Sequence, residues 1–196
     1  MELKYRLISA DDHVYEHPQV WTARLSKKWG DHVPHLETAA DGSQRWLVAG
    51  APVELPRVGG GKAMPENRVD GPMRWDEVPA AAHNATERLK AMDADGVDYS
   101  VLYPTIGGMA GERFGRLDDS ELETACAQAY NDWLIEEWAS VSPRFVPQCI
   151  VPIWPMERTV AEIRRAVALG HKGVIFPASP MELRNLPHIN EPAYDP

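Results

Sequence analysis

The sequence predicts an α/β fold whose parallel sheet belongs to a (β/α)8 barrel. Strand-like segments alternate with helix-like segments along the chain, which is the pattern of βαβ units and parallel sheets. Each strand-like segment ends in polar or aromatic residues, and barrels carry their active-site groups at the carboxyl ends of strands. An open dinucleotide-binding sheet would instead show a G-x-G-x-x-G turn after its first strand, where this chain has DDHVYE.

The predicted elements have recognisable boundaries. Asn84 can cap a helix that ends at Gly96, and Gly170 can end a later helix. Ser120 and Glu123 form an S-x-x-E capping box ahead of the longest helix. In chain order, we predict a strand at 6–14, helices at 19–28 and 84–95, a strand at 97–105, a helix at 120–141, a strand at 144–153, a helix at 159–169 and a strand at 172–179.

Residues 34–79 interrupt this alternation. Asp41-Gly42 and Ala49-Gly50 are turn signals between short alternating runs, which predicts a β-hairpin. The stretch after them contains Gly59-Gly60-Gly61 and several prolines, which is typical of a long surface loop. We expect this β-hairpin and loop insertion to lie outside the barrel, over its catalytic end or at a subunit contact.

Composition and charge narrow the function classes. The chain has 196 residues, of which 44% are hydrophobic and 25% charged, as in ordinary globular domains. Its net charge is −9, and such a surface would repel nucleic-acid phosphates and anionic lipids. Residues 1–7 do not resemble a signal peptide, and no apolar run approaches the roughly 18 residues of a membrane span. With only Cys126 and Cys149, we expect a cytoplasmic protein without disulfides that acts on a small molecule.

The stretch LISADDHVYEHP, residues 7–18, carries the strongest chemical signal. Residues i and i+2 of a strand face the same side, so Asp11 and His13 should lie together at the end of the first strand. A carboxylate and an imidazole can share one divalent metal, and Glu16 could add a ligand or position a water. The alternative is a strand end whose Asp and His are hydrogen-bonded into loop turns. The spacing alone leaves both interpretations open.

Further segments share one known pattern. ISADDHVYEHPQVWTARL, RLKAMDADGVDYSVLYPT, AYNDWLIEEWASVSPRFVPQCIVPI, GHKGVIFPA and HINEPAYDP occur in this order. Together they resemble the amidohydrolase-2 family, metal-dependent hydrolases and decarboxylases related to aminocarboxymuconate-semialdehyde decarboxylase. The resemblance covers residues 8–196 except the insertion. It implies that Asp11 and His13 match a metal-binding H-x-H motif with an acidic first residue, and that the metal is zinc or manganese.

The same resemblance implies that this chain is the amino-terminal half of the barrel. Residues 1–196 supply four of eight strands, and the family's further ligands, a histidine at the fifth strand and an aspartate at the eighth, would follow Pro196. The segment is then part of a longer chain or a half-barrel completed by another copy. Alone it should be no self-sufficient enzyme, because the strand containing Val174, Ile175 and Phe176 would leave an exposed apolar edge.

Other polar residues are candidates for substrate binding. Arg113, in the loop after the second barrel strand, could hold a carboxylate through two hydrogen bonds, as could Arg116. The alternative is a solvated loop in which an arginine pairs with a neighbouring aspartate. His188 and Glu191 follow the fourth barrel strand and could rim the pocket, or belong to a loop held by its prolines.

Several other features indicate structure rather than chemistry. Cys149 lies inside a strand and should be a small buried apolar residue, and His171 lies at the opposite end of the barrel from the site. No G-x-S-x-G motif supports a serine hydrolase. An aromatic stripe on the longest helix is typical of core or interface packing, and it consists of Tyr130, Trp133, Leu134 and Trp138.

These observations lead to two hypotheses of function. The first is a metal-dependent hydrolase or non-oxidative decarboxylase acting on a small organic acid, amide or ester, as a homo-oligomer, most simply a dimer. The second is a catalytically inactive barrel with a binding or structural role. The residues of the chain do not separate hydrolase from decarboxylase, because both use the same scaffold and metal face.

Overall fold

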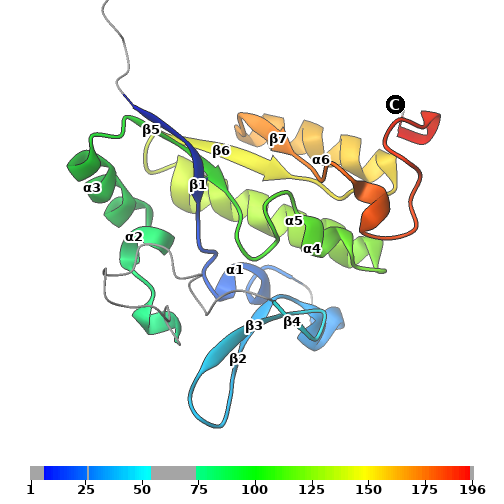
Figure 1. The fold of residues 1–196 in the computed structure, drawn as a ribbon, viewed down its shortest axis with the longest axis horizontal. Coiled ribbons are helices and arrows are strands. Elements are labelled where there is room, and N and C mark those ends of the chain that lie inside the picture. The colour runs from blue at the N-terminus through cyan, green and yellow to red at the C-terminus, as the bar shows by residue number, and fades with distance from the viewer. Residues whose placement is uncertain (1–6, 26, 54–73, 195–196) are drawn as a thin grey trace, which may run out of the picture.

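The computed structural model describes residues 7–25, 27–53 and 74–194, which form two sheets and their surrounding helices (Figure 1). The strands are β1 Ile8–His13, β2 His35–Thr38, β3 Gln44–Val48, β4 Ala51–Pro52, β5 Tyr99–Tyr103, β6 Phe145–Ile150 and β7 Gly173–Ile175. The α-helices are α1 Gln19–Thr22, α2 Ala80–His83, α3 Ala85–Asp95, α4 Glu112–Gly115, α5 Ser120–Leu134 and α6 Met156–Leu169. The π-helical η3 Ile135–Ala139 continues α5, and the 3-10 segments are η1 Lys27–His32, η2 Trp75–Glu77, η4 Pro180–Glu182 and η5 Pro192–Tyr194.

Four strands form the larger sheet, in the order β1-β5-β6-β7. All three pairings are parallel, and α3, α5 and α6 lie in the connections between successive strands. This arrangement confirms the predicted α/β class with a parallel sheet. In the part of the chain that the structure describes, no strand pairs with the outer edge of β1 or of β7, so the sheet does not close into a barrel there.

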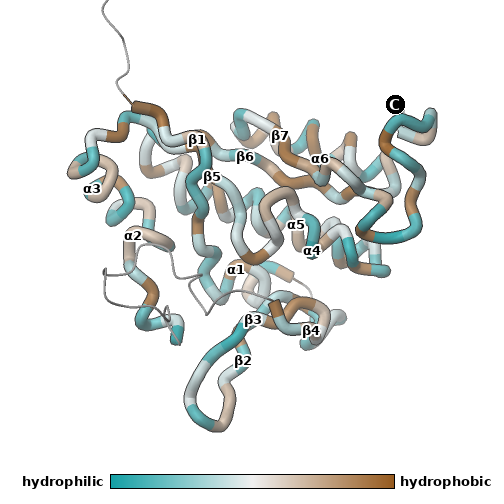
Figure 2. Tube along the Cα trace, viewed as in Figure 1, coloured by the Kyte–Doolittle hydropathy of each residue, from teal (hydrophilic) through white to brown (hydrophobic). Residues whose placement is uncertain are grey.

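The two faces of this sheet have different environments. Burial alternates along β5, where Leu102 is fully buried and Tyr103 is half-buried. Residues paired across parallel strands point to the same face. His13 therefore shares the half-exposed face with its partner Tyr103, whereas Asp12 shares the buried face with Leu102. Along the chain, Figure 2 shows apolar stretches in β6 and β7 and a hydrophilic carboxyl end of β1.

The smaller sheet is antiparallel, in the order β2-β3-β4, and lies below the carboxyl end of β1 in Figure 1. Its two turns fall at the sequence signals: Gly42 has φ 82° in the first, and Ala49 and Gly50 have φ 52° and 77° in the second. Asp41 shapes the first turn by accepting hydrogen bonds from the backbone and the hydroxyl of Ser43. The long loop predicted after this sheet falls on residues 54–73, outside the described residues.

An aromatic core joins α1, α5 and the smaller sheet. The indole ring of Trp21 packs edge to face against Trp46 and Phe114, and its Nε1 donates to the Cys126 carbonyl oxygen at 3.0 Å. The predicted stripe on the longest helix belongs to this core, and its members are Tyr130, Trp133, Leu134 and Trp138, each at most 1% exposed. The choice between core and interface packing for this stripe is thus settled in favour of the core.

Two predicted helices differ at their ends. Residues 19–28 do not form one helix, because the Arg24 amide bonds back only three residues, to the Trp21 carbonyl oxygen, and α1 ends at Thr22. A second kink follows at Gly30, whose φ is 50°. The later helix α6 begins at Met156, ahead of the predicted residue 159, directly after Pro155.

The capping box predicted for α5 is wrong. Asp119, rather than Ser120, is the N-cap, and its Oδ1 accepts from the backbone amides of Glu121 and Leu122 at 2.9 and 3.1 Å. Glu123 does not reach back to the cap, because its carboxylate is buried and binds the Ile153 amide instead. By contrast, the predicted Asn84 cap of α3 and its Gly96 stop are confirmed.

No helix among the described residues is long and apolar enough to cross a membrane.

The assignment of Asp119 as the N-cap predicts that Asp119, and not its neighbour Ser120, contributes to the stability of α5. Asp119→Ala should lower the free energy of unfolding by about 1 kcal/mol, because it leaves two amides of the first turn of α5 without an acceptor. Ser120→Ala is the matched control and should change it much less. Urea unfolding followed by tryptophan fluorescence measures both, and an equal loss for the two variants would contradict the assignment.

Candidate functional site

The carboxyl end of β1 brings Asp11 and His13 together. The Asp11 Oδ1 atom lies 3.8 Å from Nε2 of His13, and the two side chains are 70% and 16% exposed. The register of β1 against β5 shifts between Ser9 and Asp12, so β1 carries one extra residue there and Asp11 itself lies in the bulge. The two side chains are close, as the i, i+2 spacing predicts.

Hydrogen bonding determines which nitrogen of His13 is free. Its Nδ1 lies 2.7 Å from the carbonyl oxygen of Pro104, the residue that follows β5. A carbonyl oxygen only accepts, so in the neutral ring Nδ1 carries the proton and Nε2 keeps its lone pair. Metal-binding histidines are commonly held in this way, with one nitrogen donating to a carbonyl oxygen and the other presented to the metal.

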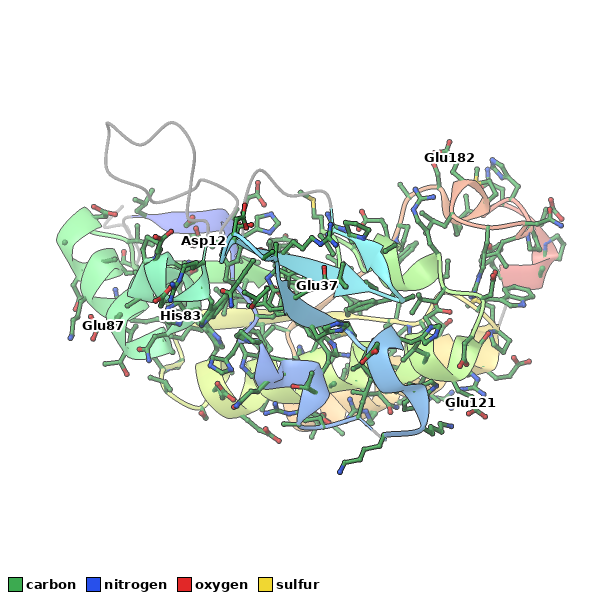
Figure 3. All side chains as sticks on the ribbon, turned by 90° about the horizontal axis from the view of Figure 1, so that it is seen from below. Asp12, Glu37, His83, Glu87, Glu121 and Glu182 are labelled. Atoms are coloured by element: carbon green, nitrogen blue, oxygen red, sulfur yellow. The ribbon has the colours of Figure 1, made fainter. Side chains whose placement is uncertain are left out.

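Asp12 occupies the opposite face from this pair. Its carboxylate accepts a hydrogen bond from the Ser100 hydroxyl, and Figure 3 shows it beside the α2–α3 helices. Arg88 of α3 approaches from the same side and donates to the His13 carbonyl oxygen at 2.9 Å. A cavity of about 360 Å³ opens between β1 and α3, with Asp11, Asp12, His13 and Arg88 among its lining residues.

Glu16 is fully buried, and its carboxyl group bridges the ends of two strands. Both of its oxygens accept from the backbone amides of Thr105 and Ile106, at 3.0 to 3.3 Å. Burial raises the pKa of Glu16 from 4.5 to about 7, while the backbone amides at the carboxyl group act in the opposite direction. The sequence predicted Glu16 as a metal ligand together with Asp11 and His13. In the structure its oxygens instead bind the turn that follows β5, at residues 105 and 106.

Arg113 binds the same turn from its other side. Its Nη1 donates to the carbonyl oxygens of Thr105 and Ile106 at 2.8 and 3.1 Å. Arg113 and Arg116 also line a cavity of about 450 Å³, whose opposite wall is the β3–β4 turn with Val48, Pro52 and Val53. The β3–β4 turn and the segment after β5 therefore meet around a cavity with two arginines on one wall and apolar residues on the other.

His188 and Glu191 lie apart from these residues, in an exposed turn after β7. The His188 amide donates to Glu191 Oε1 at 3.1 Å, and the ring Nδ1 of His188 accepts from the Asn190 amide at 3.2 Å. Figure 3 shows Glu182, on the same carboxyl-terminal segment, at the opposite end of the molecule from Asp12. The structure thus places these two candidate substrate ligands in a self-contained turn, apart from the β1 site.

A buried ion pair was not predicted from the sequence. Arg184 donates to Glu123 Oε2 at 2.6 Å and to the Leu117 carbonyl oxygen, and Glu123 accepts from the Ile153 amide at 2.6 Å. The pair ties together the chain segments that follow β5, β6 and β7. The S-x-x-E pattern did single out Glu123, but as a capping residue, because its partner Arg184 lies 61 residues away in sequence.

Two residues expected to be structural are confirmed as such. Cys149 is fully buried in β6, and burial raises the pKa of its thiol to about 11, which rules against a thiolate nucleophile. His171 is buried before β7 and donates through Nε2 to the Asn131 carbonyl oxygen at 3.1 Å, while burial lowers its pKa.

The donor set at β1 fits part of a metal site. Asp11 offers an exposed carboxylate, and His13 offers the Nε2 lone pair beside it. Among the described residues, no group of three or more His, Cys, Asp or Glu side chains converges to hold a metal ion. A zinc site needs typically three protein ligands and a water when it is catalytic. The β1 pair would therefore supply two ligands of a larger set.

Comparison with protein families shows the family of this chain. A sequence model of the amidohydrolases matches residues 35–195. The chain belongs to the amidohydrolase family. The match begins after the β1 pair, so family membership rests on the strands and helices from β2 onward and is independent of Asp11 and His13.

Solved amidohydrolase-type structures have the same chain path. An amidohydrolase from Mycobacterium avium subsp. paratuberculosis K-10 superposes with a TM-score of 0.64 and 22% identity, over 88% of this chain and 50% of that one. A 2,6-dihydroxybenzoate decarboxylase from Rhizobium superposes with a TM-score of 0.56 and 16% identity, over 97% of this chain and 44% of that one. A structure of 2,6-dihydroxybenzoate decarboxylase with 2,6-dihydroxybenzoate matches at 0.56 and 17% identity, over the same shares of each chain.

This amidohydrolase chain spans about half the length of the solved structures that it matches. A search among curated proteins finds no match to it. The relationship therefore shows the fold and the family, and the reaction has to be argued from the residues of the site.

The buried carboxyl group of Glu16 predicts a pH dependence of stability. Between pH 4.5 and about 7 the folded protein holds this proton and the unfolded chain releases it, so stability falls as pH rises through this interval. Over this pH interval, the free energy of unfolding of the wild type should fall by about 3 kcal/mol more than that of Glu16→Gln, at about 1.4 kcal/mol per pKa unit.

Urea unfolding at about pH 5 and about pH 7.5 measures this difference. Glu137→Gln, which changes an exposed carboxylate on η3, is the control and should leave the pH dependence as in the wild type. If Glu16→Gln had the same pH dependence as the wild type, the carboxyl group would not be the cause.

Proposed function

We propose that this amidohydrolase chain forms the metal-binding half of a hydrolase or non-oxidative decarboxylase that acts on a small organic acid, amide or ester. One observation carries the proposal. The Pro104 carbonyl oxygen engages Nδ1 of His13, which leaves the Nε2 lone pair beside the Asp11 carboxylate at 3.8 Å. A strand end hydrogen-bonded only for structural reasons would not require an exposed acid next to that lone pair.

Asp11 and His13 would hold the metal, with zinc or manganese as the ions that suit a carboxylate and an imidazole. A divalent ion there supplies Lewis-acid chemistry toward a substrate oxygen. The other ligands would come from the strands that complete the barrel beyond β7, whether in a longer chain or in a partner copy. The outer edges of β1 and β7, which pair with no strand in the described part of the chain, are where those strands would join.

The cavity beside the β3–β4 turn supports an acid as substrate. Arg113 and Arg116 place two cationic side chains in its wall, opposite apolar residues of the smaller sheet. Guanidinium groups bind carboxylates through paired hydrogen bonds, and the apolar wall suits an aromatic or aliphatic body. The decarboxylase among the structural neighbours is named for a substrate of this type, which makes the decarboxylase branch the first to test.

A second candidate function is a catalytically inactive barrel with a binding role. It is favoured by the convergence of only two metal-ligand side chains among the described residues. Metal content separates the two candidates, because an inactive barrel would retain no ion after reconstitution.

We further propose a homodimer in the cytoplasm. Both cysteines are free and buried, which agrees with a reducing compartment. Size-exclusion chromatography with light scattering would test the oligomeric state.

Metal content provides the direct test of the site. The purified full-length protein, which includes the strands that complete the barrel, should hold about one zinc or manganese ion per chain. His13→Ala should reduce this content and the turnover with it at least 10-fold, because it removes a ligand. His35→Ala is the matched control, since its ring also places Nδ1 against a carbonyl oxygen, at 2.8 Å, but lies on β2. Plasma mass spectrometry of the reconstituted variants gives the measurement.

Turnover should be measured on the same samples with hydroxybenzoic acids, through release of carbon dioxide, and with small amides and esters, through hydrolysis. A wild type that retains no metal after reconstitution would rule out the proposal in favour of the inactive barrel. Equal metal retention by His13→Ala and His35→Ala would place the metal elsewhere.

Arg116 provides a test of the substrate cavity. Among the described residues, its Nη1 reaches only the Glu182 carbonyl oxygen, at a long 3.5 Å, so it is available to bind a carboxylate. Arg116→Ala should raise KM for an acidic substrate about 10-fold with a smaller change in kcat, since a charged hydrogen bond contributes about 1.5–3 kcal/mol. Arg45→Ala, which removes an exposed arginine paired with Glu37 on the neighbouring sheet, should leave KM unchanged. A similar KM for all three proteins would show that the acid binds elsewhere.

A further inference from the structure

Burying the carboxyl group of Glu16 is energetically unfavourable, and its hydrogen bonds compensate for only part of this cost. Moving a carboxyl group from water into a fully buried position is unfavourable unless hydrogen bonds replace the lost hydration. Glu16 recovers these from the amides of Thr105 and Ile106, each within 3.3 Å of both oxygens. An apolar residue would avoid the desolvation altogether, so the carboxyl group should serve the turn that it binds.

That turn is held from three directions. Glu16 binds its amides, Arg113 donates to its carbonyl oxygens, and the Thr105 hydroxyl donates to the Val14 carbonyl oxygen at 2.8 Å. Because Val14 and Glu16 follow β1 directly, the turn after β5 is anchored to the end of β1 itself. Its position relative to β1 is thus determined by side chains as well as by the sheet register.

The residue just before this turn carries the acceptor for His13. The carbonyl oxygen of Pro104 accepts a hydrogen bond from Nδ1 of His13 at 2.7 Å, and the Thr105 hydroxyl lies 3.5 Å from the same nitrogen. A small displacement of the turn would lengthen this bond and allow the other tautomer, in which Nε2 carries the proton and has no lone pair to offer.

We propose that Glu16 is a positioning residue for His13, acting through the backbone turn that follows β5. Its two oxygens keep the turn against the end of β1, and the turn keeps the imidazole in its Nδ1–H tautomer. The effect on the ring does not depend on catalysis, whereas its consequence for metal affinity rests on the proposed function. Glu16 then acts behind the metal pair and not as a third ligand.

Histidine NMR tests the effect on the ring without metal. In metal-free protein labelled with ¹⁵N-histidine, at about pH 8 where the carboxyl group is ionised and imidazoles are neutral, His13 should show predominantly the Nδ1–H tautomer. The His13 signals are assigned by their loss in His13→Ala. In Glu16→Gln the side-chain NH2 group faces the backbone amides of the turn, and two donors cannot bond to each other. The turn should therefore move away from β1, and the fraction of the Nε2–H tautomer of His13 should rise severalfold.

Glu123→Gln is the matched control, because Glu123 is also a buried carboxylate that binds a backbone amide but has no connection to His13. It should lower stability while leaving the tautomer ratio of His13 as in the wild type. Should Glu16→Gln not fold, Glu16→Asp is measured in the same way, since it keeps the charge but loses the reach of one methylene. An unchanged tautomer ratio in the folded Glu16 variant, or an equal change in Glu123→Gln, would overturn the proposal.

Cobalt titration of the same variants tests the consequence for the metal. Visible absorption of bound Co²⁺ should show an affinity about 10- to 100-fold weaker for Glu16→Gln than for the wild type, the range seen when a group behind a metal ligand is removed. No cobalt binding by the wild type would refute the proposed function and leave the tautomer result standing. Cobalt binding of equal strength in wild type and Glu16→Gln would overturn the positioning role.

Discussion

The site depends on the attachment of the β5 turn to the end of β1. Parallel strands in a sheet are joined along their length by backbone hydrogen bonds, but beyond their last paired residues nothing in the sheet fixes the loops. Here the Thr105–Ile106 turn is held by a buried carboxyl group on its amide side and by the Arg113 guanidinium on its carbonyl side. The geometry of His13 follows from that attachment, because the residue just before the turn, Pro104, accepts its hydrogen bond.

A second set of contacts extends this order to the later strands. The Arg184–Glu123 pair links the segments after β5, β6 and β7, and Glu123 is almost completely buried. Buried pairs of this kind contribute little net stability compared with apolar packing, but breaking one is costly because the remaining charge is left alone. The contacts of Glu16 with the turn and the Arg184–Glu123 pair both lie at the carboxyl ends of the strands, where an amidohydrolase needs loops of defined shape.

Sequence reasoning succeeded where local pattern and local structure coincide. The alternation of strands and helices, the Asn84 cap with its Gly96 stop and the turns at Gly42 and Gly50 all depend on residues close together in the chain. It failed at α5, where the S-x-x-E pattern suggested Ser120 as the cap. Asp119, one residue earlier, is the N-cap, and Glu123 binds the Ile153 amide instead. A sequence pattern cannot show that a side chain prefers a distant arginine to its own helix terminus.

What the sequence determined by itself is the α/β class and the placement of Asp11 and His13 on one face, because a strand repeats every two residues and a helix about every 3.6. The spacing of these two residues raised the metal hypothesis beside a structural alternative, and the family resemblance favoured the metal. Only the tertiary structure decided which nitrogen of His13 is free, where Glu16 points and that Arg113 meets the β3–β4 turn around a cavity. Each of these depends on contacts between residues that lie some 60 to 90 positions apart, and such contacts arise from the packing of the chain and leave no periodic signal in it.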